Sequence, residues 1–228
     1  MTFYEELAGL AAKERDYLLT SPIIEDALQG RITLSQYAAF LKEAYFHVKQ
    51  TVPLLMACGA RLGDDKEWLR KAVAHYIADE YGHEQWILSD IAHCGFDAER
   101  VRDGEPSRAT ELMVSYAFDT IARRNPVGFF GMVYVLEGTS VALATQAAET
   151  IRSTLGLPPE AFSYLLSHGD IDQTHVQFLE SLLEQLGPED REVVTHCARR
   201  FFWLYAEIFR SLPDATTAET RDELRRVA

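Results

Sequence analysis

Apolar residues recur at the period of an α-helix along almost the whole chain, and proline or glycine separates one run from the next. In the first run Phe3, Leu7 and Leu10 share one helix face. No window alternates apolar and polar residues between turn signals, so the sequence does not favour β-strands. The pattern predicts a short segment at 22–30 and seven helices, at about 2–19, 33–62, 67–93, 107–124, 127–154, 159–186 and 189–211.

Local signals predict where some of these helices begin and bend. Thr33, followed by Gln36, predicts a capping box at the start of the 33–62 helix. Pro53 predicts a bend within that helix, because proline lacks an amide hydrogen and clashes with the preceding turn. Residues 97–106 are polar and predict a loop.

Length and composition favour one globular domain over residues 1–228, with a polar tail from about residue 213. Hydrophobic residues make up 47% of the chain and charged residues 25%, which is typical of a protein that buries a core. The 22 Lys and Arg against 35 Asp and Glu give a net charge of −13, which argues against nucleic acid or an anionic membrane as partner. We expect an all-α, single-domain helix bundle.

Cysteine spacing and the first residues predict a reduced, cytoplasmic protein. Cys58, Cys94 and Cys197 are widely spaced and odd in number, which fits neither a disulfide framework nor a zinc ribbon. Residues 1–17 carry charges throughout and lack the apolar core of a signal peptide. No stretch approaches the ~18 consecutive apolar residues of a membrane span.

The 159–186 helix carries three metal-ligand side-chain types on one narrow stripe. His168, Asp172 and His175 follow the pattern His-x3-Asp-x2-His. At 100° per residue, Asp172 lies about 40° to one side of His168, and His175 about 20° to the other. Imidazoles and a carboxylate at this spacing can close on one or two metal ions. The alternative is a helix with two solvated histidines.

Two further segments offer ligands of the same kind. Glu80 and His83 form Glu-x-x-His, which places them about 60° apart on one helix and is half of the di-iron motif of carboxylate bundles. The flanking Asp79 and Glu84 could exchange roles with Glu80. Glu137 is the only charged residue between Arg124 and Glu149, and burying a lone carboxylate is costly unless it is paired or bound to metal. The alternative for Glu137 is a hydrogen bond to a neighbouring Tyr or Arg.

The combined set of three carboxylates and three imidazoles suits two iron ions, with manganese as an alternative. Its members are Glu80, His83, Glu137, His168, Asp172 and His175. A zinc-only site more often has four ligands, frequently including Cys. A ferritin-type bundle needs a second Glu-x-x-His, but Ser140 stands where Glu137 would need its histidine.

This combination of motifs resembles the haem-oxygenase-like di-iron oxidases and oxygenases, which share a fold with thiaminase II and with the pyrroloquinoline quinone synthase oxidase. The resemblance covers about residues 15–210, and residues 21–48, SPIIEDALQGRITLSQYAAFLKEAYFHV, are similar to the opening helices of that superfamily. It implies a haem-oxygenase-like bundle with a non-haem iron site that activates O2. It also implies a small organic substrate, such as a fatty acid, an amino acid or an amine. An external electron donor and a homodimer are further expectations from the resemblance.

Tyrosines near the predicted ligands are candidate catalytic residues. Tyr164 lies one turn before His168, and Tyr134 lies three residues before Glu137. Either could hydrogen-bond a ligand or be oxidised, and a place in an aromatic core is the alternative for both. His47 is a candidate for contact with substrate or with a metal ligand, although a structural histidine in the core or on the surface is favoured.

Two other function classes remain open. A metal-free, thiaminase-like enzyme of the same fold would need a nucleophilic cysteine. A non-catalytic protein would bind metal or a partner without consuming O2. Haem is disfavoured, because residues 1–46 contain no histidine to serve as the axial ligand that haem oxygenases carry on their first helix.

Overall fold

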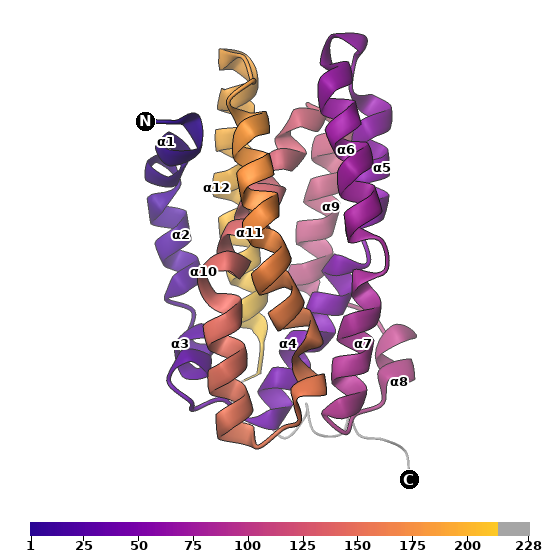
Figure 1. The fold of residues 1–228 in the computed structure, drawn as a ribbon, viewed down its shortest axis with the longest axis vertical. Helices are drawn as coiled ribbons and strands as arrows, with labels where there is room; N and C mark the ends of the chain where they lie inside the picture. Colours follow the sequence, from indigo (N-terminus) through magenta and orange to yellow (C-terminus); the bar gives the residue numbers. More distant parts are fainter. Residues whose placement is uncertain (214–228) are drawn as a thin grey trace.

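A computed structural model describes residues 1–213, apart from the side chains of residues 168–173. The described chain is a helix bundle whose long helices run roughly along one axis (Figure 1). Its helices are α1 Phe3–Leu10, α2 Ala12–Leu19, α3 Pro22–Leu28, α4 Leu34–Val48, α5 Thr51–Arg61, α6 Glu67–Glu80, α7 His83–His93, α8 Ala98–Arg102, α9 Arg108–Arg123, α10 Phe129–Leu155, α11 Ser163–Leu183 and α12 Pro188–Ser211. The described residues form no β-strand, which confirms the predicted all-α class. The predicted polar tail lies almost wholly outside the described residues.

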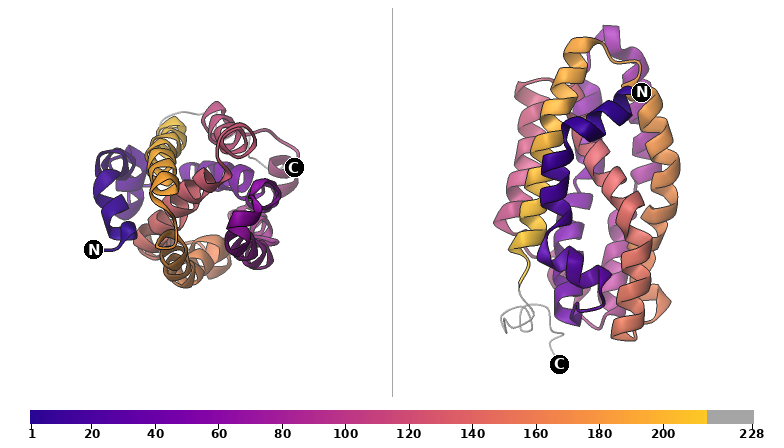
Figure 2. Two further views of the ribbon diagram at one scale, coloured as in Figure 1. Left: turned by 90° about the horizontal axis from the view of Figure 1, so that it is seen from above. Right: turned by 90° about the vertical axis from the view of Figure 1, so that its left-hand side faces the viewer.

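The view from above shows how the elements surround one another (Figure 2). The N-terminal helices α1, α2 and α3 lie on one side of the bundle, and α6 and α7 lie on the opposite side. Between them, α10 packs against α11 and α12. The first part of α10, which includes Glu137, is buried in the core, and α10 packs against α11, the helix that carries His175.

Several predicted helices are divided into two, and the sequence explains one division well. The 33–62 helix begins with the predicted capping box, in which the backbone amide of Gln36 donates to Thr33 Oγ1 at 3.3 Å. It ends as α4 at Val48 and resumes as α5 at Thr51. In a continuous helix the ring of Pro53 would clash with the carbonyl of Lys49, four residues earlier, so the helix breaks before Pro53. The predicted bend at Pro53 itself was misplaced by one turn.

Two other boundaries also differ from prediction. The 2–19 helix is interrupted at Ala11, and the 97–106 loop contains the short helix α8. Asp97 accounts for α8, because its carboxylate accepts hydrogen bonds from the amides of Glu99 and Arg100. This is an N-cap that the polar composition of the segment concealed.

The 67–93 helix is divided at the point where two predicted ligands lie. Glu80 is the last residue of α6 and His83 is the first of α7. Between them Gly82 has φ +92°, in the left-handed region that residues with a Cβ seldom adopt. The prediction that Glu80 and His83 share one continuous helix face was therefore wrong, and their relative position depends on this junction.

We expect Gly82→Ala to destabilise the protein by roughly 1–2 kcal/mol, the cost of a left-handed conformation for an L-residue. A Cβ at position 82 would have no atom of the described residues within 4 Å, so the penalty comes from the backbone alone. Urea unfolding measures it. Gly9→Ala is the matched control, because its Cβ is equally free and Gly9 lies in a helix, where alanine is favourable. Equal effects at the two positions would show that the junction is not strained.

The segment Pro126–Leu155 is long and apolar enough to cross a membrane by length and composition alone. However, 67% of its most apolar window is buried inside the bundle. This burial is what a core helix of a bundle shows. Gly131 brings α10 very close to α12, since a Cβ there would lie 2.6 Å from the amide nitrogen of Ala198.

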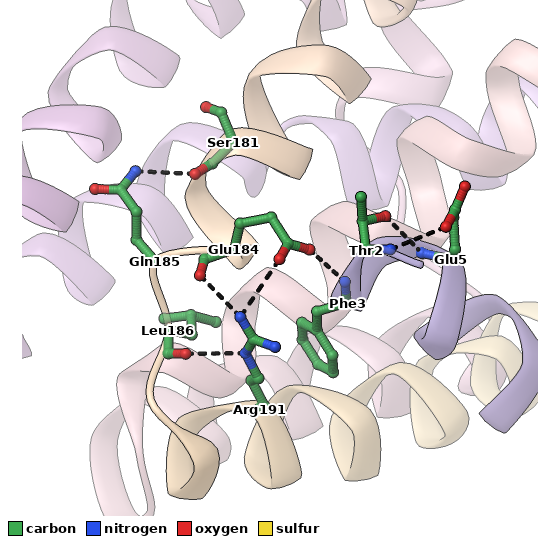
Figure 3. A network of polar contacts seen from close by, with 8 residues as sticks. All are labelled: Thr2, Phe3, Glu5, Ser181, Glu184, Gln185, Leu186 and Arg191. Atoms are coloured by element: carbon green, nitrogen blue, oxygen red, sulfur yellow. Dashed lines mark hydrogen bonds and ion pairs between the residues drawn. The ribbon is translucent and has the colours of Figure 1, made fainter.

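A polar network fixes the end of α11 to α1 and α12 (Figure 3). The Arg191 guanidinium donates to the carbonyl oxygens of Glu184 at 2.8 Å and Leu186 at 2.9 Å. It also lies over the Phe3 ring, 4.8 Å from the ring centre. The amide of Phe3 in turn donates to the Glu184 carboxylate. These contacts hold the C-terminal end of the helix that carries His175.

Candidate metal centre

Four of the six predicted ligands converge in the middle of the bundle. His175 Nδ1 lies 3.5 Å from Glu80 Oε1 and 3.6 Å from Glu137 Oε1. His83 Nδ1 lies 3.1 Å from the other oxygen of Glu80. The two carboxylates and two imidazoles come from the α6–α7 junction, the middle of α10 and the middle of α11. Residues 95 positions apart in the sequence therefore form one cluster.

All four side chains are buried, with 4–8% of their surface exposed. Placing two carboxylates in such a position is costly unless cationic or hydrogen-bonding groups compensate them. Stacking holds one imidazole, because the His83 ring lies 4.1 Å from the Trp86 ring at an angle of 22°. The His175 imidazole meets the Tyr76 ring edge to face at 5.3 Å, and the Tyr76 hydroxyl donates to the His175 backbone carbonyl at 3.5 Å.

The donor set has the chemistry of an iron site. Two imidazoles and two carboxylates are ligands that iron and manganese accept. His168 and Asp172 lie on α11, but their side chains are outside the described residues. Among the side chains that the structure describes, no group of three or more His, Cys, Asp or Glu is placed so that it could hold a metal ion as it stands. The four that converge are at direct-contact distances, and they fit iron by donor type and burial.

Asp79 contacts His175 at Nε2, the ring nitrogen that Glu80 and Glu137 do not contact. Its Oδ2 atom lies 3.4 Å from His175 Nε2 and 3.4 Å from Nε2 of the more exposed His75. A metal-binding histidine commonly donates its second N–H to a carboxylate, which fixes the tautomer and the ring. Asp79 therefore orients His175 so that Nδ1 faces Glu80 and Glu137. Asp79 and Glu80 thus contact different nitrogens of the His175 ring, and an exchange of their roles stays a prediction.

We expect Asp79→Ala to weaken iron binding by about 10- to 100-fold, the usual effect of losing a residue that orients a ligand. Competition with a chelator of known affinity measures the change. Glu84→Ala is the control, since Glu84 is the other flanking carboxylate and its described partner is the neighbouring Gln85. Equal losses in the two variants would indicate a general charge effect instead.

The two predicted catalytic tyrosines have different surroundings. Tyr164 is buried beside the ligand cluster, and its backbone amide donates to Asp90 Oδ2 at 2.9 Å. Tyr134 faces α1 and α12, where its ring contacts Tyr4 and Phe202 edge to face. Burial raises the pKa of Tyr134, so its hydroxyl stays protonated at neutral pH. A catalytic role for either tyrosine stays a prediction.

Tyr4 was not predicted from the sequence, yet it lies near the cluster. Burial raises the pKa of Tyr4, and the neighbouring Tyr134 and Glu137 raise it further. A Cβ on Gly138, the residue after Glu137, would lie 3.7 Å from the Tyr4 hydroxyl. Nothing in the spacing of the first helix distinguishes Tyr4 from a core residue, because its partners are more than a hundred residues away.

A cavity of about 80 Å³ adjoins the cluster, and we call it the ligand-side cavity. Glu80 and Glu137 line it on one side. His47 and Tyr205, whose rings meet edge to face at 5.7 Å, also line it, from α4 and α12. The sequence favoured a structural role for His47 over a substrate contact, and the position of His47 on the cavity is compatible with the substrate contact, which stays a prediction. Tyr205 was not singled out, because it lies in an ordinary amphipathic stripe.

The cluster lies inside a region that matches known proteins. A family model described as iron-containing redox enzyme matches residues 38–206, a range that contains all six predicted ligands. A 4-aminobenzoate synthase from Chlamydia muridarum is 22% identical over 203 residues, which cover 87% of this chain and 85% of the relative.

Solved structures agree on the fold. A domain of unknown function with a haem oxygenase-like fold, from Shewanella denitrificans, matches with a TM-score of 0.84 and 28% identity. The match covers 93% of this chain and 92% of that one. A TenA homolog from Pseudomonas syringae pv. tomato matches with a TM-score of 0.74 and 9% identity over 90% of each chain, which shows the fold alone. The predicted haem-oxygenase-like bundle is confirmed.

Proposed function

This chain belongs to the family of iron-containing redox enzymes, and we propose that it is a non-haem di-iron oxygenase that uses O2 to oxidise a small organic molecule. The convergence of two carboxylates and two imidazoles beside a cavity is the observation that carries the proposal. The ions would be held by Glu80, His83, Glu137 and His175, with His168 and Asp172 completing the set. Bound iron would supply the one-electron chemistry that O2 activation needs and that protein side chains lack.

The chain's own residues would orient the ligands and exclude water. Asp79 holds the proton of His175 on Nε2, which leaves the Nδ1 lone pair for a metal. Trp86 and Tyr76 restrict the two imidazole rings. Apolar side chains such as Leu55 and Met132 line the ligand-side cavity and limit the access of water to it.

A metal-free hydrolase of the same fold finds no support in the cysteines. Burial raises the pKa of the Cys58 and Cys94 thiols to about 12, so neither is a ready nucleophile. None of the three cysteines lines the ligand-side cavity as the described residues define it. Three buried, unpaired cysteines also support the proposed cytoplasmic location.

The test is to purify the protein anaerobically, load Fe(II), count the bound metal and then admit O2 with candidate substrates. We expect about two irons per chain and O2 consumption that depends on iron and substrate. Carboxylic acids, amino acids and amines are the first substrates to compare, with product analysis that includes 4-aminobenzoate. An external reductant is tested separately. Iron binding without O2 consumption would favour a non-catalytic metal protein, and absence of iron binding would refute the proposal.

A further inference from the structure

A second cavity, of about 90 Å³, lies between α3, α4, α10, α11 and α12, and we call it the apolar chamber. Its volume is several times the roughly 10–15 Å³ that one water molecule needs. No charged residue is among the described residues that line it. Ile24, Phe40, Ala147, Ile151 and Phe209 are typical of its walls. Such a space excludes charged groups and favours apolar ones.

The apolar chamber and the ligand-side cavity share three lining residues. Ser140, Tyr164 and Tyr205 line both, so the two spaces are adjacent across these three polar side chains. The Ser140 hydroxyl oxygen is buried and has no hydrogen-bond partner among the described residues. In contrast, the Tyr37 hydroxyl on the chamber wall already donates to the Ala161 carbonyl at 2.8 Å.

Helix geometry gives the direction of the chamber relative to the cluster. Glu137, Ser140 and Ile151 follow one another on α10. At 1.5 Å per residue, Ser140 lies about 4.5 Å along the helix from Glu137, and Ile151 about 21 Å from it. Moving away from the ligands, the lining therefore changes from carboxylates, through hydroxyl groups, to aliphatic side chains.

We propose that the apolar chamber binds the uncharged aliphatic part of an amphipathic substrate, whose polar, reacting end lies in the ligand-side cavity. Ser140, Tyr164 and Tyr205 then set the boundary between the two ends of the molecule, and Ser140 donates to its polar group. The far wall at Ile151 limits the length of the aliphatic part. This inference specifies the substrate class of the proposed oxygenase and rests on that function for the identity of the reacting end.

The first test uses the full-length protein with straight-chain primary alcohols from butanol to decanol, which carry no charge and need no metal. Calorimetry on the iron-loaded protein, kept anaerobic, and on the metal-free protein gives the Kd values. We expect each added methylene to tighten Kd by about fourfold until the chamber is full. NMR of isoleucine methyl groups should show shifts at Ile24 and Ile151. Affinity that does not depend on chain length would overturn the inference.

Matched variants locate the bound molecule. Ala147→Phe fills the chamber from α10 and should weaken octanol binding by at least tenfold, the loss of roughly two buried methylene groups or more. Ala142→Phe makes the same change on the exposed side of the same helix and should leave octanol binding as it is. Ser140→Ala removes the free hydroxyl and should weaken binding roughly twofold to tenfold. Equal losses for the two phenylalanine variants would place the alcohol elsewhere.

The outcomes for the chamber and for the oxygenase can be separated. Alcohol binding to metal-free protein with no iron uptake would refute the proposed function and leave the chamber in place. Iron-dependent O2 consumption, together with alcohol binding that does not depend on chain length, would support the proposed function and refute the role of the chamber. A chamber wide enough only for structural packing predicts no saturable binding at all, which also overturns the inference.

Discussion

His175→Ala should abolish iron binding and, with it, any iron-dependent O2 consumption. His175 contacts Glu80 and Glu137 through one ring nitrogen and Asp79 through the other, so it is the group that joins the three carboxylates. Loss of a residue that merely orients a ligand costs about 10- to 100-fold in metal affinity, and loss of the ligand itself should exceed that range. Chelator competition and metal analysis measure the effect.

Thermal unfolding gives a second measurement of the same variant. A metal present at a hundred times its Kd stabilises the native protein by about 2.7 kcal/mol. We therefore expect iron to raise the Tm of the natural sequence and to leave the Tm of His175→Ala almost unchanged. His93→Ala is the control, because His93 is exposed at the end of α7 and contacts Ser89 rather than the cluster. A Tm response to iron that survives in His175→Ala would show that the metal binds elsewhere.

Gly131→Ala should destabilise the protein by at least about 1–3 kcal/mol, the usual cost of overpacking a core. Its added Cβ would lie 2.6 Å from the Ala198 amide nitrogen and 2.9 Å from the Val194 carbonyl oxygen. Both atoms belong to the backbone of α12, so no side-chain rotation can relieve the clash. The helices α10 and α12 would have to separate, and α10 carries Glu137. Urea unfolding measures the loss of stability.

Gly138→Ala is the control within the same helix. Among the described residues, a Cβ at position 138 would meet the Tyr4 hydroxyl alone, at 3.7 Å, which is ordinary contact. Alanine is also favoured over glycine in a helix interior by roughly 0.8–1.0 kcal/mol. We expect Gly138→Ala to be neutral or stabilising for the metal-free protein. A similar loss of stability in both variants would mean that the close approach at Gly131 is not what limits packing.

Sequence spacing predicted the helices and part of the site because both depend on local periodicity. The capping box at Thr33 and the lone carboxylate at Glu137 are visible in a few consecutive residues, and the structure places Glu137 in the cluster. Spacing was misleading at Glu80 and His83, because it assumes a continuous helix and Gly82 interrupts it. Glu80 and His83 do lie 3.1 Å apart, but they meet across a junction rather than on one helix face.

Features that depend on long-range packing were not visible in the sequence. In the sequence Asp79 is one of two equivalent flanking carboxylates, and its contact with His175, nearly a hundred residues further along the chain, is visible only in the structure. Tyr4 and Tyr205 look like ordinary apolar-face residues of their helices. The apolar chamber is formed by five helices and has no signature in any one of them. The positions of the His168 and Asp172 side chains are still predictions.

The division of α6 from α7 between two ligands has a consequence for motion. Glu80 ends one helix and His83 begins the next, so each ligand lies in a terminal turn, where backbone amides open most readily. An ion bound to both side chains would restrict the relative motion of the two helix ends. Hydrogen exchange at the amides of residues 81–85 would then slow on iron loading, well before any change in the long helices. The exchange rates of these backbone amides would thus measure how much of the protein has metal bound.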